Sequence, residues 1–252
     1  MQLQELTWPA INALDKDTPV ILPIAAVEQH GHHLPLDTDS RLLGEIVQRV
    51  EHAMSSELLI APLMWLGNSH HHLDFSGTLS AEPRLYLDLV VSLVENILHH
   101  GFRRILVLNG HGGNDIPGKQ ALFEVRQKYR DKEDLLLLFT TYWSLGTRPW
   151  EAMPTIQQRE MGHACEWETS MIMRIAPHLV RSDVAMDEIP FGNPFLPASR
   201  AWVTQDRSDR GHIGKPHCAS AEKGEHLLSS FAADVQSLVT RMRTWNGHSW
   251  DG

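Results

Sequence analysis

The chain has 252 residues, a formal net charge of −9 and 42% hydrophobic residues, which is ordinary for a soluble globular protein. The negative charge argues against a nucleic acid or an anionic membrane as partner. The opening residues contain no basic leader and no long apolar run, and two cysteines are too few for a disulfide framework, so we expect a cytoplasmic protein without a membrane segment.

The first predicted strand, over 20–27, leads into a polar segment. Its continuous apolar run is typical of a strand that is buried on both faces. The segment that follows carries Glu28, His30 and Asp39, a mixture of oxygen and nitrogen donors that divalent transition metals bind. The spacing of apolar residues then predicts a helix over 39–54, with Thr38 as its cap. Asp39 would equally well complement the dipole of this helix, so the loop alone leaves both interpretations open.

The second predicted strand, over 58–62, is followed by a run of three histidines, 70–72. The chain has 16 histidines, which is high for its length, and histidine is the commonest metal ligand. We predict that His72 lines the substrate pocket. The simpler alternative is that this segment only leads to Ser80, which is predicted to cap a helix over 80–100.

The third predicted strand, over 104–108, runs directly into a glycine-rich turn, 109–114. Gly112 and Gly113 allow the backbone to approach a ligand closely, and we predict that both contact the substrate. His111, at the centre of the turn, suits a metal better than a phosphate, because neither a dinucleotide-binding nor a P-loop pattern is present. A helix over 115–129 and a strand over 135–139 are predicted next.

A predicted helix over 164–175 begins beside another group of polar residues. His163, Glu166 and Glu168 lie next to apolar neighbours, where a buried carboxylate must be paired or bound to a metal. The alternative is that both carboxylates face solvent and that His163 caps the helix. Trp167 is predicted to line the substrate pocket, although aromatic residues near a core more often serve packing.

The alternation of strands and helices, which closes with a helix over 220–245, predicts an α/β fold. Right-handed crossovers give a three-layer α/β/α arrangement around a mostly parallel sheet. No linker divides the chain, so we expect a single domain over 1–252. Ligands bind such sheets at the carboxyl ends of the strands, and three of the polar segments directly follow predicted strands.

Together these segments resemble the creatininase (creatinine amidohydrolase) family. The matching positions are 22–23, 27–31, 34–39, 75, 77–80, 109–114, 163–164 and 168–170, with a looser match over 214–224. The resemblance spans nearly the whole chain, and it implies a compact creatininase-like α/β/α fold and a homo-oligomer, often a hexamer.

The resemblance also implies one or two divalent ions, either zinc, manganese or iron. Their ligands would be Glu28, His30, Asp39 and His111. Asp39 would bridge two ions, and Glu168 matches the glutamate of the family's Glu-Thr-Ser motif, as a further ligand or as a general base. His163 matches the histidine that moves protons in creatininase itself.

Gly113 departs from the pattern of creatininase, which has at this position a glutamate that serves the second metal. Other branches of the family have glycine there, and those are not creatinine enzymes. Creatinine is therefore not the expected substrate. The branches of the family act on other cyclic amides, formamides, peptides and sugar-derived ring ketones.

We therefore predict a metal-dependent hydrolase in which activated water attacks a small cyclic amide, a formamide or a related carbonyl substrate. One alternative is a hydrolase or isomerase of a sugar- or inositol-derived ring ketone or lactone at the same metal site. A second alternative is a non-catalytic module that binds a nucleotide or phosphosugar at the 110–113 turn. The density of histidines and carboxylates argues against this module.

Overall fold

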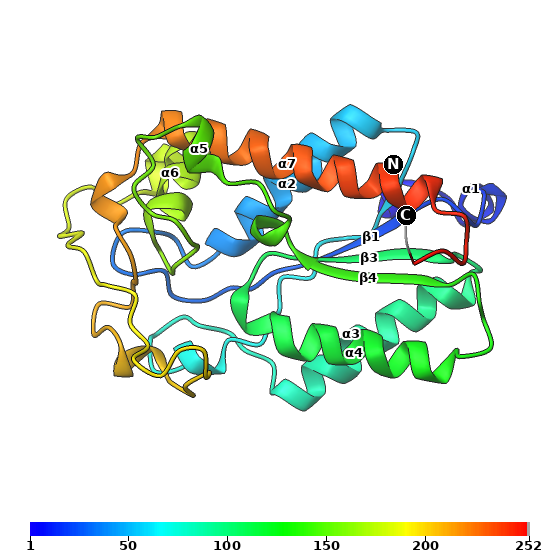
Figure 1. Cartoon of the computed structure of the whole chain (residues 1–252), viewed down its shortest axis with the longest axis horizontal. Coiled ribbons are helices and arrows are strands. Elements are labelled where there is room, and N and C mark those ends of the chain that lie inside the picture. Colours follow the sequence, from blue (N-terminus) through cyan, green and yellow to red (C-terminus); the bar gives the residue numbers. More distant parts are fainter. Residues whose placement is uncertain (251–252) are drawn as a thin grey trace.

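A parallel four-stranded sheet lies between two layers of helices in the computed structural model, which describes residues 1–250 (Figure 1). The strands are β1 (Val20–Ile24), β2 (Leu59–Ile60), β3 (Arg104–Asn109) and β4 (Leu136–Thr141), in the spatial order β2-β1-β3-β4. All three strand pairs are parallel, so the predicted three-layer α/β/α fold is confirmed.

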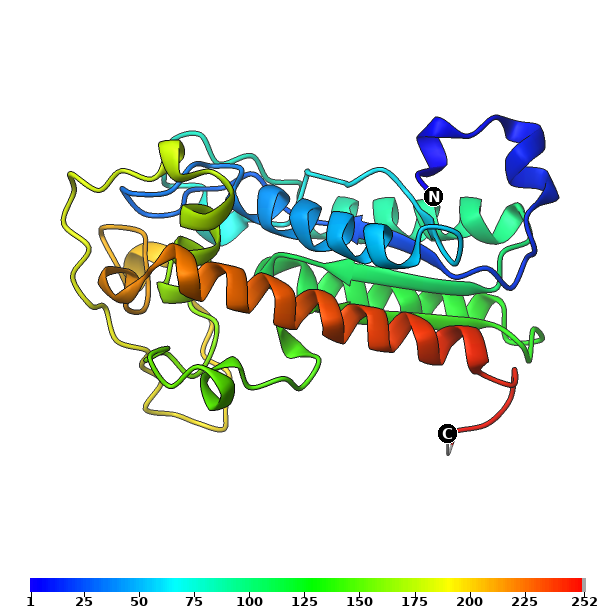
Figure 2. The same cartoon turned by 90° about the horizontal axis from the view of Figure 1, so that it is seen from above.

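The two faces of the sheet belong to separate hydrophobic cores, because successive strand residues point to opposite sides. One core joins Ile21 and Leu106 to α2 (Thr38–Met54), α6 (Glu166–Ile175) and α7 (Ala221–Thr244). The other core joins Leu22 and Val107 to α3 (Pro83–His99) and α4 (Asp115–Lys128). Figure 1 shows α2 and α7 above the sheet with α3 and α4 below it, and Figure 2 shows α7 crossing the length of the molecule.

The short elements within residues 1–250 are α1 (Trp8–Ala13), α5 (Pro149–Ala152) and seven 3-10 turns, among them His70–His72 and Gly112–Asn114. α1 lies at the end of the molecule away from the carboxyl ends of the strands (Figure 1). The segments between α5 and α7 gather at the carboxyl ends of the strands, at the left of Figure 1. No helix within residues 1–250 is long and apolar enough to cross a membrane.

The ends of several elements differ from the sequence prediction for local reasons. Ser80 does not cap α3, because its hydroxyl is engaged by the backbone N–H of Ser69 and by His70. The carboxylate of Glu82 instead accepts the first N–H groups of that helix. Thr38 is the first residue of α2 rather than its cap, and its hydroxyl donates to the Pro35 carbonyl.

The first two strands are shorter than predicted, and each ends where the chain leaves the sheet toward the site. β1 ends at Ile24 rather than at residue 27, and β2 has only two residues. The apolar runs continue beyond both strands because their side chains remain buried, as those of Ala25 and Ala26 do.

Candidate metal centre

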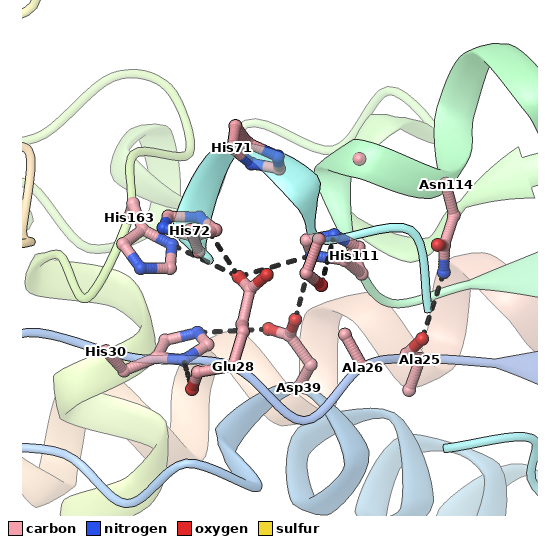
Figure 3. Close-up of polar contacts among 12 residues, drawn as sticks. Ala25, Ala26, Glu28, His30, Asp39, His71, His72, His111, Asn114 and His163 are labelled. Carbon is pink, nitrogen blue, oxygen red and sulfur yellow. Dashed lines mark hydrogen bonds and ion pairs between the residues drawn. The ribbon is translucent and has the colours of Figure 1, made fainter. Parts of the chain in front are cut away.

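Four of the predicted ligands meet at the carboxyl ends of β1 and β3 (Figure 3). Glu28 and His30 follow β1, His111 follows β3, and Asp39 lies in the first turn of α2. Their exposed fractions are 1%, 0%, 3% and 3% respectively, so all four are shielded from bulk water.

The segment from residue 28 to 39 folds back on itself, which returns Asp39 to the end of β1. Gly31 has a φ of +64°, in the left-handed region that glycine adopts without a steric penalty. The Glu28 N–H donates to the Leu36 carbonyl across 2.9 Å and closes the loop. On the other side, the Asn114 side chain donates to the Ala25 carbonyl across 3.0 Å and fixes the glycine-rich turn to the end of β1 (Figure 3).

Asp39 lies between two histidines and presents one carboxylate oxygen to each. Its Oδ1 is 3.1 Å from His30 Nε2, and its Oδ2 is 3.0 Å from His111 Nδ1. His111 Nδ1 also lies 3.3 Å from Glu28 Oε1. Asp39 is thus placed to contribute a carboxylate oxygen to a cation together with either histidine.

Glu28 faces further histidines as well. Its Oε1 lies 3.4 Å from His72 Nε2 and 3.6 Å from His163 Nδ1 (Figure 3). Four overlapping groups of three donors have all their ligand atoms within 4.8 Å of one another. They are Glu28–His30–Asp39, Glu28–His71–His111, Glu28–His72–His163 and His30–His163–Glu168.

Glu168 presents one carboxylate oxygen to the cluster and uses the other to cap its helix. Oε1 lies 3.7 Å from His30 Nε2, and Oε2 accepts the Cys165 N–H across 3.2 Å. Cys165, rather than His163, occupies the cap position of α6. Glu168 is only 4% exposed, so the solvent-facing alternative is wrong for this residue.

Two neighbours of Glu168 on α6 point away from the cluster. Glu166 is fully buried and paired with the Lys223 ammonium across 2.6 Å, so the solvent-facing alternative fails for it too. Trp167 packs near Phe231 in the core and donates its indole N–H to the Gln158 carbonyl. The structure thus does not bring Trp167 to the predicted ligands.

The second carboxylate oxygen of Glu28 has no hydrogen-bond partner within the described chain. Oε2 is buried, and no N–H or O–H group of residues 1–250 donates to it. A buried carboxylate oxygen without a donor is costly because it has lost water and gained nothing in exchange. A cation beside Glu28 would remove this cost.

His163 contacts Gln29 through both the backbone and the side chain of that residue. Its Nε2 lies 2.7 Å from the Gln29 carbonyl, which accepts, and 2.9 Å from the Gln29 amide nitrogen, which donates. Burial and the neighbouring His30 lower the pKa of His163 to about 3, and the ring is therefore neutral near pH 7. Nδ1 lies 3.6 Å from Oε1 of Glu28, and these two atoms belong to one of the donor groups that could hold a cation.

The carboxylates of the cluster raise the pKa values of His30 and His111, in contrast to the lowered pKa of His163. Burial opposes the charge on His30, but Asp39 raises the pKa of this histidine well above its usual value. Against the same effect of burial, Glu28 and Asp39 raise the pKa of His111 to about 10. The pKa of Asp39 is in turn lowered by these two histidines, although burial alone would raise it. Positive charge is thus strongly favoured within the cluster.

The space around Gly113 is already filled by the segment that carries the consecutive histidines. A Cβ atom at this position would lie 2.2 Å from the Asn68 carbonyl oxygen and 2.5 Å from His111 Nε2. It would also lie 2.9 Å from Cε1 of His71. A side chain at Gly113 therefore has no room, whereas a Cβ at the exposed Gly112 meets nothing within 4 Å.

Three residues at the site were not predicted from the sequence. His71 shares a donor group with Glu28 and His111, and the run of histidines was its only signal. Gln29 Nε2 lies within 2.9 Å of ring nitrogens of both His72 and His163. Thr204 Oγ1 lies 2.7 Å from His72 Nδ1, and the irregular segment that carries Thr204 has no sequence motif.

Comparison with known proteins gives consistent matches. The family model described as creatininase, creatinine amidohydrolase, matches residues 4–239. The mycofactocin precursor peptide peptidase of Mycobacterium ulcerans (strain Agy99) is 30% identical, and the alignment covers 95% of this chain and 86% of the relative. The creatinine amidohydrolase of Pseudomonas putida is 28% identical, with 93% and 94% covered. A crystal structure of creatinine amidohydrolase (creatininase) superposes with a TM-score of 0.84 at 24% identity, over 97% of this chain and 98% of that one.

Proposed function

Because the chain belongs to the creatininase family and is a hydrolase, we propose that it hydrolyses the amide bond of a small substrate at one or two divalent metal ions. The observation that carries the proposal is the buried Oε2 of Glu28, which has no hydrogen-bond partner within residues 1–250. This burial is unfavourable in the protein alone, and a cation beside the carboxylate would relieve it.

The donor set fits a transition metal better than a hard cation such as calcium. Carboxylate oxygens and imidazole nitrogens together are typical ligands of zinc, manganese and iron. The proposed ligands are Glu28, His30, Asp39, His111 and Glu168. Three of them are carboxylates buried together, an arrangement that itself favours cations.

The proposed ligands fall into two sets that both adjoin Asp39, so they would hold one or two ions. The first would use Glu28 and His111, which lie on one side of Asp39. The second would use His30 and Glu168 on the other side. In this arrangement Glu168 supplies the carboxylate for which Gly113 leaves no room.

A divalent ion at this site supplies Lewis acidity, which lowers the pKa of water toward neutrality and polarises the substrate carbonyl. His163 is the proposed proton carrier: its buried, neutral ring lies beside Glu28, where it would take a proton from the attacking water and pass it to the leaving nitrogen. Gly112 is exposed and leaves open space beside His111, so it is the proposed substrate contact of this turn. At Gly113 the segment that carries the histidines fills the corresponding space. His72 is buried against the Glu28 carboxylate, where it is proposed to border the bound substrate.

The proposed substrate class follows from the bond that the relatives named above have in common. A peptide peptidase and a creatinine amidohydrolase both cleave carbon–nitrogen amide bonds. We propose that the substrate is a cyclic amide, a formamide or a short peptide. Creatinine is not proposed, because Gly113 stands where creatininase has a glutamate that serves the second metal.

The test is a hydrolysis screen of lactams, formamides and short peptides with purified enzyme. Chelator treatment should abolish turnover, and Zn²⁺, Mn²⁺ or Fe²⁺ should restore it. Hydrolysis that persists after complete metal removal would contradict the proposal. Stoichiometric binding of a nucleotide or phosphosugar to the metal-free protein, without hydrolysis of any amide, would favour the non-catalytic binding module instead.

A further inference from the structure

A cavity lies beside the metal centre, within the irregular segment that precedes α7. It has a volume of about 250 Å³ and is lined mainly by Asn193, Ser199, Arg200, Trp202, Asp206 and Arg207. Small-molecule sites usually span roughly 300–1,000 Å³, so this cavity suits one end of a substrate rather than a whole molecule.

Trp202 connects the cavity to the metal centre. Its indole packs edge-on against the His71 ring with 5.2 Å between centroids, and His71 belongs to a donor group with Glu28 and His111. The Arg207 guanidinium lies 5.2 Å from the centroid of the same indole. The cavity therefore begins one aromatic side chain away from the proposed ligands.

Arg207 is half-buried and has no carboxylate partner within residues 1–250. Its guanidinium stacks on the Trp202 indole instead. The nearby Arg210, in contrast, forms an ion pair with Asp187. Burial lowers the pKa of Arg207, which shows the cost of placing its charge there, although Glu160 partly opposes this effect.

The acidic residue that lines the cavity does not neutralise the arginine. Asp206 Oδ2 accepts the Val203 N–H across 3.1 Å and so stabilises its own turn. Arg200, which is exposed, adds a second positive charge to the lining. The cavity thus combines a flat aromatic wall with a partly desolvated cation that forms no ion pair within residues 1–250.

We propose that Arg207 and Trp202 form a specificity subsite that binds an anionic end group of the substrate, either a carboxylate or a phosphate, while the amide lies at the metal centre. A guanidinium pairs with either oxyanion through two parallel N–H donors, and stacking on an indole holds its plane. The inference rests on the proposed function, since it assigns the second end of the same substrate.

The experiment measures the binding of small probes to the metal-loaded enzyme by ligand-observed NMR. The probes are N-acetylalanine, its uncharged twin N-acetylalaninamide, and ethyl phosphate. We expect one of the anions to bind at least about tenfold more tightly than the amide, the size of a charge-assisted hydrogen bond. The anion that binds more tightly identifies the end group.

Variants separate this subsite from direct binding to the metal. Arg207→Ala should weaken anion binding about tenfold or more and leave the amide unchanged, and Arg207→Lys should fall between because it keeps the charge but loses the fork. Arg210→Ala removes the same charge outside the cavity and should have no effect. Anion binding that survives Arg207→Ala, or no anion binding by the wild type, overturns the inference.

Hydrolysis is assayed separately, so the two proposals fail independently. Arg207-dependent binding without metal-dependent hydrolysis would refute the proposed function. Metal-dependent hydrolysis without Arg207-dependent binding would refute only the subsite.

Discussion

Glu28 is the residue on which the geometry of the site converges. Three histidines face its Oε1, and no donor in residues 1–250 satisfies its Oε2. Its surroundings make sense for a metal ligand and are costly for a structural carboxylate. Glu166 shows the contrast: it is equally buried, but Lys223 and two backbone N–H groups satisfy it.

Glu168 is expected to act as a ligand rather than only as a base. Glu168→Gln keeps an oxygen for the cap of α6 and removes the charge that faces His30. We expect the metal content to fall, while the metal-free protein still unfolds in a cooperative transition. The checks are metal analysis and chemical denaturation. An unchanged metal content together with a turnover loss of about 10²- to 10⁴-fold would make Glu168 a general base alone.

Gly113 and Gly112 form a matched pair for testing how tightly the glycine-rich turn is packed. Gly113→Ala places a methyl group against Asn68 and His111, so we expect a loss of about 1–3 kcal/mol in the free energy of unfolding. Gly112→Ala meets nothing within 4 Å and should stay close to the wild type. Denaturant unfolding measures both, and equal stabilities of the two variants would contradict the crowding at Gly113.

At the residue scale, the sequence identified side chains that carry a motif and missed those that do not. Glu28, His30 and His111 directly follow apolar runs, so the rule for parallel sheets predicts their common edge. Thr204 and Arg207 lie in an irregular segment, where no periodicity indicates which side chain turns inward. Trp167 was predicted to line the substrate pocket because it is adjacent to Glu168 in the chain. Its side chain instead packs into the core, since neighbouring residues of a helix point in different directions.

At the element scale, an ion-pair cluster connects the three helices on one face of the sheet. Glu225 on α7 accepts from Arg49 on α2 and from Arg174 on α6. The hydrogen bonds from Arg49, assisted by Arg174, lower the pKa of Glu225 to about 2 from 4.5. The stabilisation that it provides is therefore complete above pH 4.5 and disappears as the pH falls toward 2.

Glu225→Gln should lower the free energy of unfolding at pH 7 by up to about 1 kcal/mol, a small value because the carboxylate is 41% exposed. The difference from the wild type should vanish near pH 2. Glu133→Gln, which removes the same charge at an exposed residue outside the helices with no ion pair in residues 1–250, serves as the control. Urea denaturation across this pH range would contradict the account if the difference did not depend on pH.

The elements themselves could be predicted from the sequence, but their ends could not. Apolar periodicity identified every strand of the sheet and each long helix, because burial on one or both faces determines that pattern. The ends depend on hydrogen bonds between distant residues. Ser80 looks like a cap but bonds to Ser69, and Glu82 caps α3 in its place.

At the scale of the whole molecule, α4 and the edge strand β4 leave an apolar surface. On α4, Ile116 is 82% and Phe123 66% exposed, and β4 has no further partner strand among residues 1–250. Surfaces of this kind are usually covered by another protein chain. We expect copies of this chain to cover it, in a homo-oligomer.

Light scattering should give a mass that is a multiple of 28.5 kDa at about 10 μM protein. Phe123→Asp should shift the distribution of molecular masses toward that of the monomer. Phe195→Asp changes a similarly exposed residue on a different segment and should leave the distribution unchanged. A wild-type protein that remains monomeric up to high concentration would refute this expectation.

The central claim is that the buried cluster binds a catalytic metal, and it is tested most directly by the metal content of the wild type and of His111→Ala. We expect at least one equivalent of divalent metal per wild-type chain, and in His111→Ala a joint loss of metal and amide hydrolysis of about 100-fold or more. His52→Ala, at an exposed histidine of α2, should keep both. A wild type without stoichiometric metal, or a His111→Ala variant that keeps its metal and its activity, would contradict the account.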